Sequence, residues 1–264
     1  MNQTPSAIVT GGSAGLGTVI AQKLDESGYR ITISGRNAER LNELAAVHPT
    51  WRTFAGDATQ SETAVALVQQ HVEVFGGLDV LVNVVGQSDR GRVDALHVDR
   101  LRELFEANVV STLVHCGAAM ESLRASRGVI VNIGSLAGRV APGYLGGYVA
   151  AKHALSGLTR QMRLELKDTG VHVGLICPGP IAREDAGQRY SVDEHDDIPS
   201  GASGPGGGAK LKGLSPESVA DAVLQCIRER RIEVVMPWKV RLLMAIDAVS
   251  PALADRLLAS KMPA

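Results

Sequence analysis

The chain has 264 residues, 45% of them hydrophobic, 21% charged and only 3% aromatic, a composition typical of globular proteins that excludes collagen-like, disordered and disulfide-scaffold classes. Its formal net charge of −1 at pH 7 provides no general positive field, so binding to nucleic acid or to an anionic membrane is not expected. Three cysteines at wide spacings, without a CxxC pair, argue against disulfides and a metal site and favour a cytoplasmic location.

Short β-branched segments alternate with longer segments of helical periodicity along most of the chain. The first apolar run, from Ala7, is too short for a signal peptide or a membrane span and predicts a strand. The expected strands are 7–10, 30–34, 52–55, 80–85, 129–133, 171–176 and 233–236, and the expected helices are 17–27, 62–75, 99–123, 144–166 and 215–230. Strands that are apolar throughout, between amphipathic helices, are typical of a parallel sheet covered on both faces. The sequence therefore predicts one doubly wound α/β domain.

Two segments depart from this alternation. Residues 182–213 have little apolar pattern and contain a glycine-rich run at 201–208, which predicts a flexible substrate loop or a disordered insertion. Residues 238–264 form an expected C-terminal extension of two helices, the second starting at Ser250-Pro251. We expect this apolar tail to cover the substrate pocket or another subunit rather than lie on a membrane surface.

A glycine-rich turn follows the first strand. Residues 10–17 read Thr-Gly-Gly-Ser-Ala-Gly-Leu-Gly and lead into the first helix. Glycines let the backbone turn sharply and approach a ligand, and the N-terminus of the helix offers free N–H groups to a phosphate. A glycine triplet alone also fits a turn without a ligand, but the first strand–helix junction of a doubly wound sheet is where dinucleotides bind. The turn therefore predicts a dinucleotide site.

The end of the second strand bears on which dinucleotide is bound. An acidic residue there would hold the ribose diol of NAD, whereas this chain has Ser34-Gly35-Arg36. No carboxylate repels a 2′-phosphate, and the Arg36 guanidinium can pair with one. The sequence thus favours NADP(H) over NAD(H), with Arg36 as a solvated surface charge the competing interpretation.

Tyr148 and Lys152 lie four positions apart in an expected helix, so both side chains project from one face. A phenol is a poor acid–base group at neutral pH, and a nearby ammonium favours its ionised form. Ser135 follows the end of a strand, at the edge where open α/β sheets bind ligands. Tyr-x-x-x-Lys alone also occurs on exposed helix faces, but the two signals together predict a centre for proton transfer.

From about residue 5 to residue 182, the chain resembles the short-chain dehydrogenase/reductase family in an unbroken series of motifs. The glycine turn resembles the family's TGxxxGxG turn, Asp57-Ala58 its adenine-contacting aspartate, and Asn83 to Gly86 its NNAG motif. Pro178-Gly179-Pro180-Ile181 resembles its PG motif beside the nicotinamide. The resemblance implies a Rossmann-type sheet of seven strands. It also implies cofactor contacts from Gly11, Ser13, Gly15, Leu16, Gly17, Arg36, Asp57, Ala58, Asn83, Gly86, Tyr148, Lys152, Pro178, Gly179 and Ile181.

The same resemblance implies a catalytic tetrad of Asn108, Ser135, Tyr148 and Lys152. In this reading, Tyr148 is the general acid in reduction and the general base in the reverse direction, and Ser135 holds the carbonyl oxygen. Lys152 binds the nicotinamide ribose and lowers the tyrosine pKa, and Asn108 orders a water of the proton relay.

Two departures from the family pattern are evident. Val84 and Val85 replace smaller residues of the NNAG motif, and we expect them to crowd the adenosine side of the sheet. The threonine that often follows the PG motif is replaced around Ala182-Arg183, where Arg183 is the candidate to reach the pyrophosphate instead.

The expected function is therefore NADP(H)-dependent hydride transfer between the nicotinamide and a small, apolar ketone, aldehyde or alcohol. One alternative is an NAD-dependent alcohol dehydrogenase, against which the absence of a carboxylate at Gly35 argues. Another is a catalytically idle dinucleotide sensor or scaffold, against which the complete tetrad argues. The resemblance also implies a homodimer or homotetramer packed through the helix of Tyr148, which offers the small residues Ala150, Ala151, Ala154 and Gly157.

Overall fold

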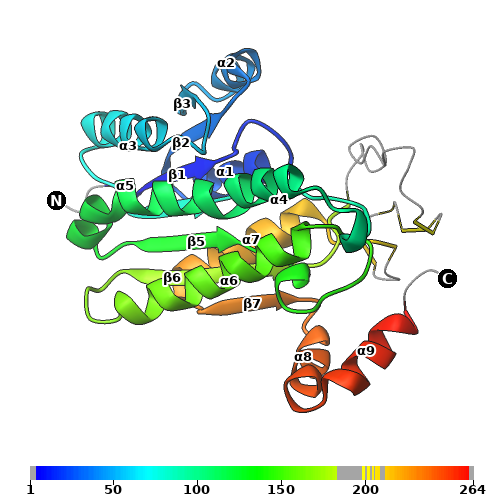
Figure 1. Cartoon of the computed structure of the whole chain (residues 1–264). Helices are drawn as coiled ribbons and strands as arrows, with labels where there is room; N and C mark the ends of the chain where they lie inside the picture. Colours follow the sequence, from blue (N-terminus) through cyan, green and yellow to red (C-terminus); the bar gives the residue numbers. More distant parts are fainter. Residues whose placement is uncertain are drawn as a thin grey trace.

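Seven parallel strands form one sheet in the order β3-β2-β1-β4-β5-β6-β7 (Figure 1). The structure, a computed structural model, describes residues 4–182, 198–199, 201–202, 204, 206–208 and 212–261. The strands are β1 (Ser6–Thr10), β2 (Arg30–Gly35), β3 (Arg52–Ala55), β4 (Val80–Asn83), β5 (Val129–Ile133), β6 (His172–Pro178) and β7 (Glu233–Met236). The helices are α1 (Gly15–Glu26), α2 (Ala38–Val47), α3 (Ser61–Phe75), α4 (Val98–Phe105), α5 (Ser111–Ser126), α6 (Tyr148–Glu165), α7 (Pro216–Glu229), α8 (Val240–Val249) and α9 (Pro251–Ala259). The predicted doubly wound domain with seven strands is confirmed.

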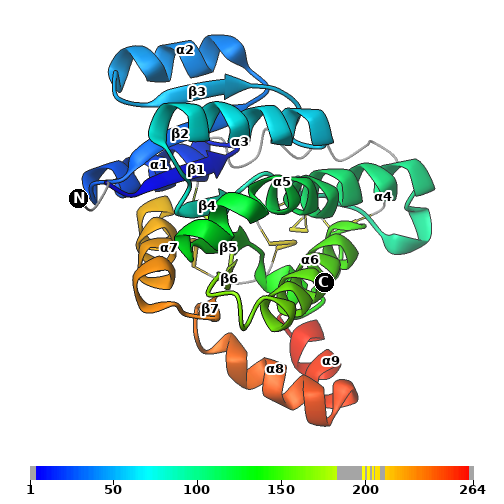
Figure 2. The same cartoon turned by 90° about the vertical axis from the view of Figure 1, so that its left-hand side faces the viewer.

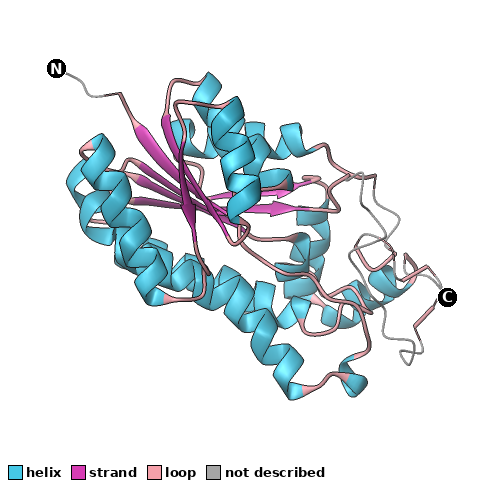
Figure 3. Ribbon diagram, turned by 90° about the horizontal axis from the view of Figure 1, so that it is seen from above, coloured by secondary structure: helices cyan, strands magenta, loops and turns pink. Residues whose placement is uncertain are grey.

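Helices cover both faces of the sheet, as Figures 2 and 3 show from two directions. On one face, α1, α2 and α7 pack against strand residues such as Val9, and on the other face α3, α5 and α6 pack against residues such as Ile8. Adjacent residues of a strand point to opposite faces, and both of these side chains are fully buried. This explains why the central strands are apolar at every position.

A buried histidine links β1, β2 and α3 on the face of the sheet that α3, α5 and α6 cover. One ring nitrogen of His71 lies 2.7 Å from the hydroxyl of Thr32, and the other lies 3.1 Å from that of Ser6. Burial, with a smaller contribution from the charge of Arg30, lowers the pKa of His71 to about 4. The ring is therefore held neutral, as a polar bridge within an apolar layer.

The structure corrects several predicted boundaries. Helix α2, which the sequence analysis missed, begins after Asn37, whose side-chain oxygen accepts a hydrogen bond from the Arg40 amide at 2.9 Å. The strand expected at 80–85 ends at Asn83, because the chain then leaves the sheet and the Val84 amide donates to the Thr10 hydroxyl at 3.1 Å. The helix expected from residue 144 begins at Tyr148, since Tyr144 has a φ of 61°, outside the helical region. The helix expected at 99–123 is divided into α4 and α5 by the π-helical turn η2 (Glu106–Val110).

The two helices expected after Trp238 are present as α8 and α9, and they project beyond β7 (Figure 1). Val240, Leu243 and Met244 anchor α8 to a small apolar cluster near the ends of β6 and β7. Trp238 and Leu242 remain 71% and 68% exposed. Within the described part of the chain, no helix is both long and apolar enough to cross a membrane. Most of the expected substrate loop at 182–213, including Arg183, lies outside the described residues.

Candidate active site

A large cleft, with a volume of about 2420 Å³, lies at the carboxyl ends of the central strands. Its lining includes the glycine turn after β1, Arg36 and Asp57 beyond β2 and β3, and Tyr148 at the start of α6. Parallel α/β sheets bind ligands at this edge because the loops that follow the strands converge there. Among the described residues, every one that the sequence analysis assigned to catalysis or to the cofactor lines this cleft, except Asn83.

The glycine turn brings α1 against the end of β1 at very close range. A Cβ atom on Gly17 would lie 2.2 Å from the carbonyl oxygen of Gly11, so only glycine fits there, and Gly11 itself has a φ of +66°. The N-cap residue of α1 is Ala14, whose side chain cannot accept a hydrogen bond from the first amides of the helix. The first amides of α1 therefore face the cleft without a side-chain acceptor, which is the arrangement that binds phosphate groups.

Two guanidinium groups line the cleft beyond β2. Arg36 is exposed, and the described residues offer it neither a hydrogen bond nor an ion pair, whereas Arg40 of α2 donates to Glu43 at 2.7 Å. Gly35 offers no carboxylate, and a Cβ there would lie 2.4 Å from the Ser13 hydroxyl oxygen, so any larger residue would require Ser13 to move. The end of β2 therefore carries positive charge and lacks the carboxylate that would bind a free ribose diol.

Asp57 also lines this end of the cleft, next to Ala58. Its carboxylate accepts hydrogen bonds from the backbone amide of Thr59 at 3.0 Å and from the Thr59 hydroxyl at 2.9 Å. These bonds, with a smaller contribution from the charge of Arg36, lower the pKa of Asp57. The side chain is thus fixed as an ionised acceptor at the mouth of the cleft.

The π-helical turn places Asn108 at the cleft. Its side-chain amide donates to the carbonyl oxygens of Leu104, at 2.8 Å, and Gln87, at 2.9 Å. The Ser111 hydroxyl satisfies the carbonyl of Ala107 at 2.7 Å, so side chains provide hydrogen bonds within the widened turn. The Asn108 side-chain oxygen is buried and has no hydrogen-bond partner in the structure, which leaves it available to a water or a ligand.

Lys152 is almost fully buried and donates to the carbonyl of Ile133 at 3.0 Å. Its ammonium lies 5.8 Å from the centre of the Tyr148 ring. Burial lowers the pKa of Lys152 from 10.5 to about 8. A Cβ on Gly86 would lie 2.7 Å from the Asn108 side-chain oxygen and 3.3 Å from the Lys152 nitrogen, so the backbone at Gly86 lies close to both polar groups.

Ser135 and Tyr148 line the same cleft from different elements. Ser135 follows β5 and caps a short 3-10 turn, with its hydroxyl oxygen accepting from the amide of Ala137 at 3.1 Å. Its hydroxyl hydrogen remains available to a substrate oxygen. Tyr148 is half-buried and is the first residue of α6. The four expected catalytic residues are thus brought together at one cleft.

Asn83 has a different place from the one expected. It is 3% exposed, and its amide donates to the side-chain oxygen of Asn132 at 2.9 Å, while Asn132 donates to the Thr159 hydroxyl at 2.9 Å. This chain of bonds joins β4, β5 and α6 behind the cleft. Val84 and Val85, the expected crowding residues, both line the cleft, and Val85 packs on the glycine turn, with its Cγ2 3.2 Å from where a Cβ on Gly11 would lie.

Several cleft residues were missed by the sequence analysis. They include Arg40, the loop from Gln87 to Arg92, and Arg100 of α4. Arg40 could have been found from the Asn37 cap and the acidic residue in the first turn of α2. Leu243, Leu258 and Lys261 of the C-terminal tail also line the cleft, which is one of the two places where the sequence analysis expected this tail to pack.

Comparisons with known proteins agree with this geometry. The sequence pattern of the family described as short chain dehydrogenase matches residues 5–193. The ketoacyl reductase HetN from Nostoc sp. is 28% identical to this chain over 264 residues, which cover 96% of this chain and 87% of HetN. A short-chain dehydrogenase structure from Streptomyces avermitilis is similar in fold, with a TM-score of 0.82, 23% identity and 98% of each chain covered. A structure of a variant of actinorhodin polyketide ketoreductase with NADPH has a TM-score of 0.75 at 25% identity, covering 88% of this chain and 95% of its own.

Proposed function

The chain belongs to the short-chain dehydrogenase family of oxidoreductases that act on carbonyl and alcohol groups, and we propose that it is an NADP(H)-dependent reductase of a ketone or aldehyde. The observation that carries the proposal is the single cleft lined by Arg36, the glycine turn, and Tyr148 with Lys152. One end of this cleft suits a phosphorylated dinucleotide, and the other end suits proton transfer to a carbonyl oxygen.

The residues of the cleft fit a nicotinamide dinucleotide. The amides that begin α1 suit the pyrophosphate, Arg36 suits a 2′-phosphate, and Lys152 suits the nicotinamide ribose. When bound, such a cofactor supplies the hydride for carbonyl reduction. The NADPH held by the actinorhodin ketoreductase supports the choice of NADP(H), and Gly35 supports it further, because no carboxylate can be placed there without moving Ser13.

In this proposal, Tyr148 donates its hydroxyl proton to the carbonyl oxygen, and Ser135 orients that oxygen by a hydrogen bond. The ammonium of Lys152 favours the phenolate that remains after proton transfer. Because the pKa of Lys152 is about 8, the ammonium predominates at pH 7, and carbonyl reduction should weaken as the pH rises through 8. The unpartnered oxygen of Asn108 suits a water that returns a proton to the site.

The remaining lining points to the kind of substrate. Leu136, Val140 and Leu145 line the cleft together with Leu243 and Leu258 of the tail. These aliphatic side chains suit an apolar substrate body, with its reacting oxygen directed toward Tyr148. We therefore propose a small apolar ketone or aldehyde as substrate, with the corresponding alcohol as product.

Replacing Tyr148 by Phe tests the mechanism, because the ring and its packing are kept and only the proton donor is lost. Turnover of NADPH with a panel of apolar ketones should fall by about 10²–10⁴-fold, while the dissociation constant for NADPH, measured by fluorescence titration, should stay within a few-fold. Lys152→Ala should instead weaken both cofactor binding and turnover. A folded Tyr148→Phe protein with half the wild-type turnover would exclude Tyr148 as the proton donor. Cofactor binding without turnover of any carbonyl or alcohol by the wild-type protein would favour the idle sensor.

We also propose that the chain assembles as a homodimer or homotetramer through α6. Ala150 and Gly157 are exposed on this helix and Ala154 is half-buried, so they leave space for a second helix. Ala151, which the sequence analysis placed on the same surface, is instead fully buried within the subunit. Light scattering at micromolar concentration should give the mass of a dimer or tetramer, and a monomer would contradict the proposal.

A further inference from the structure

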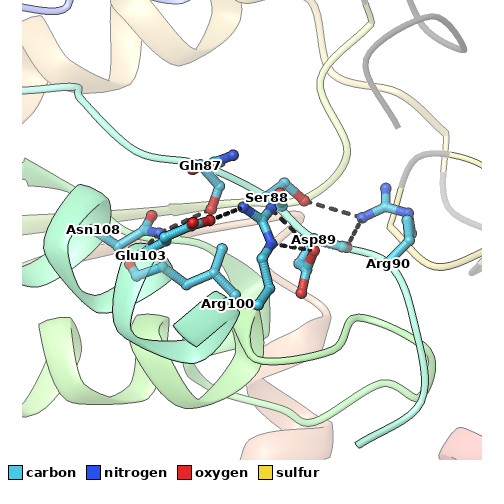
Figure 4. Close-up of polar contacts among 8 residues, drawn as sticks. Gln87, Ser88, Asp89, Arg90, Arg100, Glu103 and Asn108 are labelled. Atoms are coloured by element: carbon cyan, nitrogen blue, oxygen red, sulfur yellow. Dashed lines mark hydrogen bonds and ion pairs between the residues drawn. The ribbon is translucent and has the colours of Figure 1, made fainter. Parts of the chain in front are cut away.

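Arg100 connects α4 to the loop that follows β4 (Figure 4). Its guanidinium donates twice to one carboxylate oxygen of Asp89, at 3.1 Å in each case, and once to Glu103 at 2.9 Å. The Asp89 side chain is only 11% exposed and that of Arg100 is 31% exposed. A pair this protected from water is screened less than the surface ion pairs of the same helix.

The loop held by Arg100 carries the support of Asn108. The carbonyl of Gln87 accepts one of the two hydrogen bonds from the Asn108 amide (Figure 4). The side chain of Gln87 lies beside the same guanidinium, and its oxygen, when turned toward Arg100, lies 3.0 Å from Nη1. Arg100 therefore contacts both Asp89 and the side chain of Gln87, the residue whose carbonyl orients the Asn108 side chain.

The other side of this loop contacts the segment that leads into Tyr148. The amide of Gly91 donates to the carbonyl of Tyr144 at 3.2 Å, and the amide of Gly146 donates to the carbonyl of Gly91 at 3.0 Å. The Asp89 carboxylate lies against Gly146, where a Cβ would come within 2.4 Å of it. Asp89 is therefore in contact with α4, through Arg100, and with the backbone two residues before Tyr148.

We propose that the Arg100–Asp89 ion pair is a positioning device that fixes residues 86–91 between Asn108 and the segment preceding Tyr148. The pair thereby sets the placement of Asn108 relative to Tyr148, two residues that the proposed reaction uses. This inference rests on that proposed function. Arg100 and Asp89 are positioning residues, since they act through Gln87 and Gly146. Loss of Arg100 leaves the Asp89 carboxylate poorly solvated and without its charge partner, and loss of Asp89 leaves Arg100 paired with Glu103 alone, so either change frees the loop.

Hydrogen–deuterium exchange tests the structural part of the inference without any turnover. In Arg100→Gln, the amides of residues 86–91 and 144–148 should exchange faster than in the wild-type protein, whereas Arg100→Lys should show a smaller change. The matched control is Arg102→Gln, because Arg102 on the same helix pairs with Asp99 at 2.7 Å and both side chains are more than 70% exposed. Unchanged exchange in both segments of a folded Arg100→Gln protein would overturn the inference, whatever the enzyme's activity.

Steady-state kinetics test the functional part. Arg100→Gln and Asp89→Asn should each lower kcat by about tenfold to a hundredfold, as misplacement of reacting groups does, with NADPH affinity within about twofold of wild type. The double variant should lose no more than the worse single variant, because both remove the same contact. A raised KM with unchanged kcat would show that Arg100 binds substrate, and would overturn the positioning role. Wild-type turnover in Tyr148→Phe would instead count against the proposed function, and leave the exchange result to decide on the ion pair.

Discussion

Replacing Arg36 by Ala should separate the two nicotinamide cofactors. The described residues give Arg36 no hydrogen bond or ion pair, so within the protein its loss removes only its smaller effect on the pKa of Asp57, and the main effect comes from the ligand. A hydrogen bond to a charged group contributes about 1.5–3 kcal/mol, or about tenfold to a hundredfold in affinity. Because Arg36 is exposed and screened by water and salt, we expect the lower part of that range.

The assay is fluorescence titration of NADPH and of NADH on wild-type and Arg36→Ala protein at two salt concentrations. The dissociation constant for NADPH should rise about tenfold at low salt and by less at high salt, while that for NADH should change little. NADH is the internal control, because it lacks the 2′-phosphate but uses the rest of the cleft. Equal weakening of both cofactors would refute the assignment. Arg40→Ala should have the smaller effect, since that guanidinium is already engaged by Glu43.

Two further predictions follow from buried positions. Above pH 6.5, His71 is neutral in both the folded and the unfolded chain. Between pH 6.5 and 4, the unfolded chain binds a proton at His71 that the folded chain, with a pKa of about 4, does not bind. The free energy of unfolding should therefore fall by about 3 kcal/mol as the pH is lowered from 6.5 to 4. His71→Gln should flatten this pH dependence in urea unfolding, and an unchanged slope would contradict the assignment. Gly17→Ala should abolish NADPH binding in the same titration, because the added methyl would lie 2.2 Å from the carbonyl of Gly11, whereas Gly77→Ala, whose methyl meets no atom within 4 Å, should bind as wild type. Tight NADPH binding by Gly17→Ala would show that the turn can move.

The sheet could be predicted from the sequence because its signals are local. Each strand is a short apolar run between amphipathic helices, and the junction after β1 carries its glycines in series. Tyr148 and Lys152 were found in the same way, since four residues of helix bring two side chains to one face. The family resemblance then placed Asn108 and Ser135.

The features that were missed depend on contacts distant in sequence. Helix α2 buries only Leu41 and Leu44, so its periodicity is faint. Asn83 matches a cofactor motif by position, but its partner Asn132 lies 49 residues away and turns it into a support of the sheet. The role of Arg100 depends on Asp89, and no spacing rule links these two residues to Tyr148. Sequence patterns therefore identified the groups proposed to react more readily than those proposed to hold them in place.

The widened turn at Glu106–Val110 also keeps two helices in phase. Leu104 and Leu123 lie 19 positions apart and both are fully buried. At about 100° per residue, an uninterrupted α-helix would rotate the second about 100° away from the first after five full turns. A π-helical turn absorbs about one residue, which offsets a rotation of this size, so both leucines can be buried. The additional residue of the turn, which places Asn108 at the cleft, thus also lets α4 and α5 both bury a leucine. Deleting one residue from this turn would rotate α4, and would move Arg100 away from residues 86–91.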